Sequence, residues 1–179
     1  MIVKNKLGKY YGLTKFPKFK EFLYFIPLLI LMSVNLWSGV HINNTPAEIT
    51  LYILFMICVG FLEEIIFRGF LFKMMAKDNV NTAIIVSSLT FGIGHIINLF
   101  NGAALIPTLI QVCYAVAGGY LFVIIFQKGK SLWPCIIAHA TINALSIFGI
   151  ENEVSTYIAP VFLILISISY AVYLNRTIK

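Results

Sequence analysis

Apolar residues gather in six long segments of this chain, separated by short polar stretches. The segments cover residues 22–40, 48–68, 82–100, 104–126, 132–149 and 155–174. A helix needs about 20 predominantly apolar residues to cross a bilayer, at about 1.5 Å of rise per residue. All six segments have roughly this length. The pattern therefore predicts an all-α protein, a membrane helix bundle of about six transmembrane helices.

The basic residues are predicted to lie on one side of this bundle. Six lysines precede the first segment, and the other seven Lys and Arg stand at or after the ends of the second, fourth and sixth segments. The connections around 41–47, 98–103 and 150–154 contain none. With six alternating spans, the positive-inside rule then places both termini in the cytoplasm.

The composition supports a multi-pass protein of the cell membrane. Of the 179 residues, 60% are hydrophobic and 11% are charged, whereas a soluble domain is about half apolar and roughly a quarter charged. Residues 1–21 form a basic cytoplasmic segment that is too short for a core, and residues 22–179 form the membrane domain. This excludes a large soluble catalytic domain, makes the lipid bilayer the main partner and indicates no nucleic-acid binding.

Five acidic, basic or imidazole side chains stand deep within the apolar segments, accompanied by one amide. They are Glu63, Glu64 and Arg68 in the second segment, His95 in the third, and His139 with Asn143 in the fifth. Such groups are costly at membrane depth and usually face the protein interior or a water-filled cavity. Interhelical hydrogen bonds in membranes average only about 0.6 kcal/mol, too little to justify so many desolvated groups by packing alone. We therefore expect one functional cluster.

Helical spacing assigns these side chains to faces. Glu64 and Arg68 are four residues apart, so they share a face and can form an ion pair. Glu63 points about 100° away from Glu64, so the two carboxylates cannot have the same role. In the third segment, Gly92 and Gly94 would let a neighbouring helix backbone approach closely.

The same counting predicts how deep the cluster lies. A helical hairpin that turns near Asn79 leaves Glu63 and His95 each 16 residues from the turn, hence level with one another. His139 stands some ten residues beyond the basic connection 128–131, or about 15 Å deep at 1.5 Å per residue. These distances allow one polar cluster in the cytoplasmic half of the bilayer.

Three short sequences carry the cluster: EEIIFR (63–68), FGIGH (91–95) and HATIN (139–143). They resemble the motifs EExxxR, FxxxH and HxxxN of the CAAX-processing and bacteriocin-processing endopeptidases, also called the CPBP or Abi family of intramembrane proteases. The type II CAAX prenyl protease is a member of that family. The order, spacing and apolar context of the motifs agree over residues 60–143.

The resemblance implies an endopeptidase that cuts a peptide or a membrane-tethered protein near the cytoplasmic membrane surface. Glu63 would be the general base that deprotonates a water molecule, and His95 would help to position that water. Amide hydrolysis needs such an activated nucleophile, together with groups that stabilise the developing oxyanion.

The remaining motif residues would support this reaction. By the resemblance, His139 and Asn143 would donate hydrogen bonds to the tetrahedral oxyanion. Glu64 and Arg68 would orient the catalytic groups without touching the substrate. These roles agree with the shared face of each pair.

The sequence leaves the role of a metal open. Two imidazoles and a carboxylate can hold a catalytic zinc ion, with water as the fourth ligand; the ligands here would be His95, His139 and Glu63. No HExxH pair is present, however, and the same groups can act without metal. We favour a mechanism without a cofactor.

Two other classes of function are compatible with these residues. One is a bacteriocin-immunity or scaffold protein whose role does not need catalysis. The other is a transporter or proton relay, because ion pathways also use intramembrane Glu, His and Arg; the broken helices and inverted repeats typical of transporters are not apparent. The identity of the substrate, its prenylation and the oligomeric state are not determined by the sequence.

Overall fold

A computed structural model describes residues 2, 4–14, 16 and 25–178 of the chain. Regular structure in this part is helical, apart from one isolated antiparallel bridge between Val40 and Gly149. The all-α prediction is confirmed. Among the described residues, four helical stretches are long and apolar enough to cross a membrane; they are Pro46–Met75, Val80–Phe100, Leu105–Gly129 and Val154–Thr177. Their number and composition make the chain a multi-pass membrane protein.

The other two predicted spans contain shorter helices. The fifth segment forms α8 (Trp133–Leu145), which a 3₁₀ turn extends to Phe148; together they rise about 24 Å, less than the hydrocarbon core of about 30 Å. The first segment contains α2 (Ile26–Met32) and a 3₁₀ turn at Val34–Leu36. The first residues predicted for this segment, 22–24, lie outside the described residues. Six spans therefore remain a prediction, of which four meet the length criterion.

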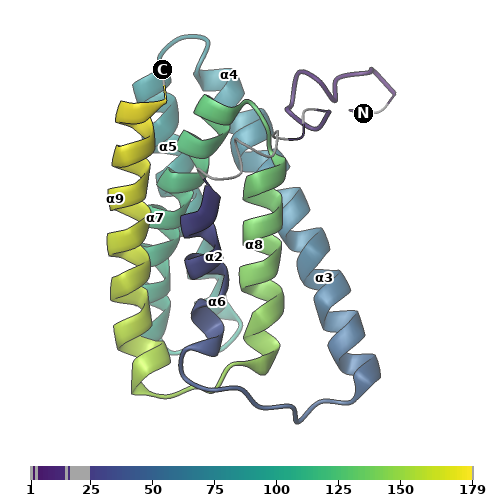
Figure 1. Ribbon diagram of the computed structural model, residues 1–179, viewed down its shortest axis with the longest axis vertical. Coiled ribbons are helices and arrows are strands. Elements are labelled where there is room, and N and C mark those ends of the chain that lie inside the picture. Colours follow the sequence, from purple (N-terminus) through teal and green to yellow (C-terminus); the bar gives the residue numbers. More distant parts are fainter. Residues whose placement is uncertain (1, 3, 15, 17–24, 179) are drawn as a thin grey trace.

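The longer helices are α3 (Pro46–Glu64), α5 (Val80–Ile93), α7 (Leu105–Gly129) and α9 (Ala159–Thr177). Together with α8 they pack in two groups. In one group, α7 packs against both α5 and α9; in the other, α3 packs against α8. Helix α2 contacts α8 and α9 and so joins the two groups, as Figure 1 shows.

The helix that carries both glutamates changes its winding just after them. It begins with a capping box, in which the Thr45 hydroxyl accepts from the Glu48 amide and the Glu48 carboxylate accepts from the Thr45 amide. After Glu64 the helix widens into a π-helical stretch, Ile65–Phe72, and ends in α4 (Lys73–Met75). π-helical turns occur frequently at functional sites. The apolar pattern placed this helix at 48–68, whereas it continues to Met75, and it gave no sign of the widened turns.

The turn of the predicted hairpin is confirmed at Asn79. Its side chain accepts a hydrogen bond from the Thr82 amide and so caps α5. Several basic residues lie at the end of the bundle where this turn stands, and we call it the basic end. The basic residues there are Lys73, Lys77, Lys128, Lys130 and Arg176. Residues 4–14 and the C-terminal end of α9 lie at this same end (Figure 1). Lys15, Lys18, Lys20 and Lys179 lie outside the described residues.

The opposite end of the bundle is formed by the connections around 41–48, 98–104 and 149–154. We call it the acidic end, because these stretches contain Glu48, Glu151 and Glu153 and no Lys or Arg. Charge is thus distributed unequally between the two ends of the bundle, as the sequence pattern predicts.

A glycine sets the separation of α5 and α7. A Cβ atom at Gly92 would lie 2.8 Å from the Val116 nitrogen and 2.9 Å from the Val112 oxygen. The expected close approach is therefore confirmed at Gly92. It is wrong for Gly94, where a Cβ would meet nothing within 4 Å, because that residue faces away from the neighbouring helix.

Replacing Gly92 by alanine should destabilise the bundle, since the added methyl group meets backbone atoms of α7 that cannot rotate away. Overpacking of this kind typically costs about 1–3 kcal/mol. The measurement is the thermal unfolding midpoint in detergent, with Gly94→Ala as the matched control. We expect a lower midpoint for Gly92→Ala only; equal midpoints for the two variants would contradict the close approach.

Candidate active site

The site forms where α3 and α8 come close together. A Cβ atom at Gly60 would lie 2.9 Å from the backbone nitrogen of Ala140, so glycine is what allows the two helices to approach. This contact brings His139 next to both adjacent glutamates. Its Nδ1 lies 2.9 Å from Glu64 Oε1, and its Nε2 lies 3.7 Å from Glu63 Oε2.

Glu64 and Arg68 form a fully buried ion pair. Arg68 Nη1 donates to Glu64 Oε1 at 2.9 Å, and both side chains are wholly inaccessible to solvent. Arg68 Nη2 donates to the Gly119 carbonyl of α7 at 3.2 Å. The ion pair predicted from the spacing is thus present, and it also ties α3 to α7.

The buried ion pair determines which nitrogen of His139 faces outward. The Glu64 carboxylate can only accept hydrogen bonds, so Nδ1 of His139 carries the proton that this contact needs. Nε2 is then the atom that faces Glu63. A carboxylate that fixes the orientation of an imidazole in this way is a common feature of catalytic histidines.

Phe91 is the apolar centre around which the polar groups are arranged. The Arg68 guanidinium lies 4.2 Å from its ring centroid, and the rings of His95 and His139 pack edge-on at 5.4 and 5.5 Å. The side chain itself is buried. We did not predict a role for Phe91, although it is the first residue of FGIGH and so could have been found from the motif.

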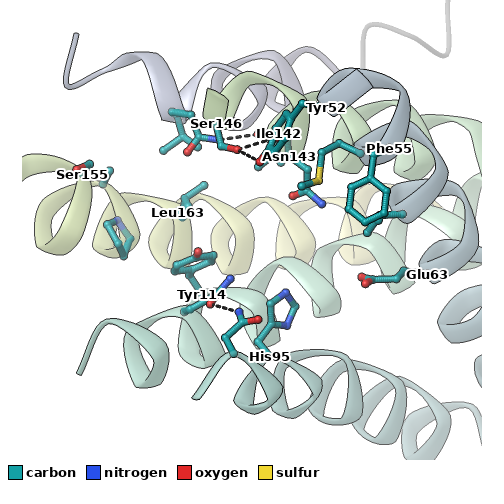
Figure 2. A pocket seen from close by; sticks show the side chains of 18 residues that line it. Tyr52, Phe55, Glu63, His95, Tyr114, Ile142, Asn143, Ser146, Ser155 and Leu163 are labelled. Carbon is teal, nitrogen blue, oxygen red and sulfur yellow. Dashed lines mark hydrogen bonds between the residues drawn. The ribbon is translucent and has the colours of Figure 1, made fainter. Parts of the chain in front are cut away.

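His95 lies on a 3₁₀ turn, Gly94–Ile96, that follows α5. Its Nδ1 lies 3.1 Å from the Phe91 carbonyl oxygen and donates to it. This bond fixes the ring and leaves Nε2 available to another partner. Figure 2 shows His95 on one wall of a pocket, with Glu63 at its far edge.

That pocket has a volume of about 410 Å³. Glu63, His95 and Asn143 line it, together with further polar side chains, namely Asn35, Tyr52, Asn98, Gln111, Tyr114, Ser146 and Ser155 (Figure 2). A smaller adjoining cavity of about 80 Å³ is lined by His139 and shares His95 and Asn143 with the first. Glu63, His95 and Asn143 therefore border the larger hollow, whereas His139 borders the smaller cavity.

Only one of the two adjacent carboxylates is accessible from this hollow. The Glu63 side chain is 35% exposed, whereas that of Glu64 is completely buried. Glu63 can therefore meet a water molecule or a substrate, and Glu64 cannot. The two side chains thus have different surroundings, as their 100° separation predicted.

Some of the polar lining was missed from the sequence. Asn98 Nδ2 donates to Gln111 Oε1 at 2.9 Å, which joins the end of the third segment to the start of the fourth, and Tyr114 lies one turn further along the same helix. Asn98 stands near the end of its apolar segment, a position equally typical of residues at a membrane surface. Gln111 and Tyr114 stand inside the fourth segment, and their polar groups within an apolar run were the available signal.

Comparison with models of protein families gives a match to the type II CAAX prenyl endopeptidase Rce1-like family over residues 45–145. The matched region covers more than half of the chain and includes all three motifs. The chain belongs to this family. Comparisons with curated proteins and with solved structures gave no match. Membership in the Rce1-like family confirms the resemblance seen in the motifs and makes the chain a member of a protease family that acts on peptides or proteins.

The Rce1-like motifs do not form a ligand set for a metal in this arrangement. Among the residues that the structure describes, no three His, Cys, Asp or Glu side chains are grouped so that they could hold a metal ion. Glu63 and His139 approach each other, but His95 is not grouped with them as a third ligand. The three residues that the sequence left open as zinc ligands are therefore not grouped together in the part of the chain that the structure describes.

Proposed function

We propose that this protein is an intramembrane endopeptidase of the cell membrane, in which Glu63 activates the water molecule that attacks the peptide bond. One observation carries the proposal: Glu63 is the accessible carboxylate of the pair, in a polar hollow that His95 and Asn143 also line, and its Oε2 lies 3.7 Å from His139 Nε2. Positioned general bases typically contribute about 10²–10⁴-fold to a rate.

The first step places a water molecule between Glu63 and His95. Glu63 takes one proton of the water while the water oxygen attacks the carbonyl carbon of the substrate. His95 Nε2 orients the water, because Nδ1 is already engaged with the Phe91 carbonyl. The step forms a tetrahedral intermediate with a negative charge on the former carbonyl oxygen.

Asn143 and His139 stabilise that charge. The amide of Asn143 is a donor in either cavity. His139 becomes a donor at Nε2 when this nitrogen carries a proton; Nε2 is the ring atom that faces Glu63, at 3.7 Å. Collapse of the intermediate breaks the carbon–nitrogen bond, and Glu63 returns the proton to the leaving amine.

The test of this proposal is cleavage by the purified protein in detergent. Peptides and tethered proteins extracted from cell membranes are incubated with wild type or with Glu63→Gln, and new peptide termini are identified by mass spectrometry. We expect termini that appear only with wild type. Their absence, with the protein folded, would favour the immunity or scaffold function instead.

A chelator is expected to leave the cleavage rate unchanged, because the described residues assemble no metal-ligand set. The measurement is the initial rate after dialysis against EDTA and 1,10-phenanthroline, with a zinc-dependent peptidase treated in parallel as the control. Loss of activity that added zinc restores would contradict the metal-free mechanism, and would leave the peptidase function standing.

A further inference from the structure

The last turn of α8 carries Asn143, one of the two donors that stabilise the oxyanion in the proposed reaction. The helix ends at Leu145, and a 3₁₀ turn, Ser146–Phe148, follows it. The last four carbonyl groups of an α-helix have no partner within the helix, and those of Ile142 and Asn143 are among them. Helix ends fray, so the position of the Asn143 side chain depends on what binds these carbonyl groups.

A side chain from a distant segment binds the first of these carbonyls. Asn35 lies on the 3₁₀ turn Val34–Leu36, and its Nδ2 donates to the Ile142 carbonyl at 2.5 Å. The same turn also approaches the connection beyond α8, since a Cβ atom at Gly149 would lie 2.6 Å from the Asn35 carbonyl oxygen. Asn35 thus fastens the end of α8 to the first apolar segment.

Two hydroxyl groups, which we call the hydroxyl chain, lead to the Asn143 carbonyl. This carbonyl accepts from the Ser146 amide and also from Ser146 Oγ, at 2.7 Å. The Tyr52 hydroxyl of α3 lies 2.7 Å from the same Ser146 oxygen. A serine hydroxyl has one proton to donate, and the Asn143 carbonyl takes it here. Tyr52 is therefore the donor to Ser146.

The hydroxyl chain connects Asn143 to the helix that carries the proposed base. Tyr52 and Glu63 both line the larger pocket, and they stand about three helical turns apart on one face of α3. Figure 2 shows Tyr52 beside Asn143, across the pocket from His95. The last turn of α8 is thus fixed relative to the helix of Glu63.

We propose that Asn35 and Tyr52 are positioning residues, which hold the Asn143 amide where the oxyanion forms. Each acts through the last turn of α8, and neither belongs to the three motifs. An oxyanion donor acts only over about 2.7–3.1 Å, and a misplacement of about 1 Å can cost about 10²-fold in rate. The effect on the reaction rests on the proposed function, whereas the hold on the turn does not.

Removal of the Tyr52 hydroxyl tests the role by kinetics, at equal amounts of folded protein. Tyr52→Phe keeps the ring; Tyr173→Phe, the same change at an exposed position of α9, is the matched control. We expect Tyr52→Phe to lower kcat about 10- to 100-fold at an unchanged KM, since the oxyanion forms only after the substrate is bound. The control should keep the wild-type kcat. A wild-type kcat in Tyr52→Phe would overturn the proposal.

Two further comparisons separate positioning from general stability. Ser146→Ala breaks the hydroxyl chain, whereas Ser146→Thr keeps a hydroxyl that can bond the carbonyl three residues back. We expect only the alanine variant to lose kcat. In an Asn143→Ala background, Tyr52→Phe should cause no further loss, because the amide that it positions is gone. Equal losses in the two Ser146 variants, or a full additional loss in the double variant, would assign Tyr52 a purely structural role.

Hydrogen exchange follows the same turn without catalysis. The backbone amides of residues 146–149 are measured by mass spectrometry in detergent for wild type, Asn35→Ala, Tyr52→Phe and the control Tyr173→Phe. We expect faster exchange in the first two variants only; unchanged exchange in both would overturn the proposal. Faster exchange together with a wild type that cleaves no peptide would refute the proposed function and leave the hold of the two side chains on the turn standing.

Discussion

Glutamine in place of Glu63 is expected to reduce peptide cleavage by about 10²–10⁴-fold, the usual contribution of a general base. The amide keeps the size and shape of the carboxylate but cannot accept the proton of the attacking water. Because the Glu63 side chain is 35% exposed and lies 3.7 Å from His139, the change removes no buried ion pair, and the variant should remain folded and inserted in the membrane.

The rate is measured as the formation of new peptide termini by equal amounts of folded protein, judged by thermal unfolding in detergent. Glu153→Gln is the matched control, since it makes the same chemical change at an exposed position at the acidic end. Cleavage that persists in Glu63→Gln at the wild-type rate would assign the base to another group and refute the mechanism proposed here.

Replacing Arg68 by methionine should cause the largest loss of stability among single changes in the site. Glu64 would then keep a buried charge with no permanent cation beside it, and breaking a buried ion pair from one side typically costs about 3–5 kcal/mol. The bond from Arg68 to the Gly119 carbonyl and the contact with the Phe91 ring would be lost as well. We expect a markedly lower unfolding midpoint in detergent and poor accumulation in membranes.

A second replacement separates the charge from the packing. Adding Glu64→Gln to Arg68→Met removes the unpaired charge, while the glutamine oxygen can still accept from His139 Nδ1. The double variant should therefore be more stable than Arg68→Met alone. If the double variant is no more stable than the single one, the loss arises from packing around Phe91 and not from the buried charge.

Several features of this protein follow from the sequence by itself. Apolar runs of membrane-spanning length predict helices because a buried backbone in lipid must satisfy its own hydrogen bonds. The turn at Asn79 and the Glu64–Arg68 ion pair are also local, since they depend on residues three or four positions apart. The three motifs placed the chain in its family, because they preserve residue types at fixed helical spacings.

The sequence was less informative where a helix ends or changes its winding. It predicted six spans of similar length, whereas α8 with its 3₁₀ turn is short, and the π-helical stretch after Glu64 had no visible signal. Both features depend on how neighbouring helices pack, since tertiary contacts decide where a marginal helix stops.

Only the tertiary structure decided how the polar groups are divided between the protein interior and the hollow. It buried Glu64 against Arg68 and His139, left Glu63 accessible, and placed Phe91 among them. These outcomes depend on the rotation of each helix and on close contacts between distant segments, such as Gly60 with Ala140. Hydrophobic periodicity describes one helix at a time, and a cavity is defined by the helices that surround it.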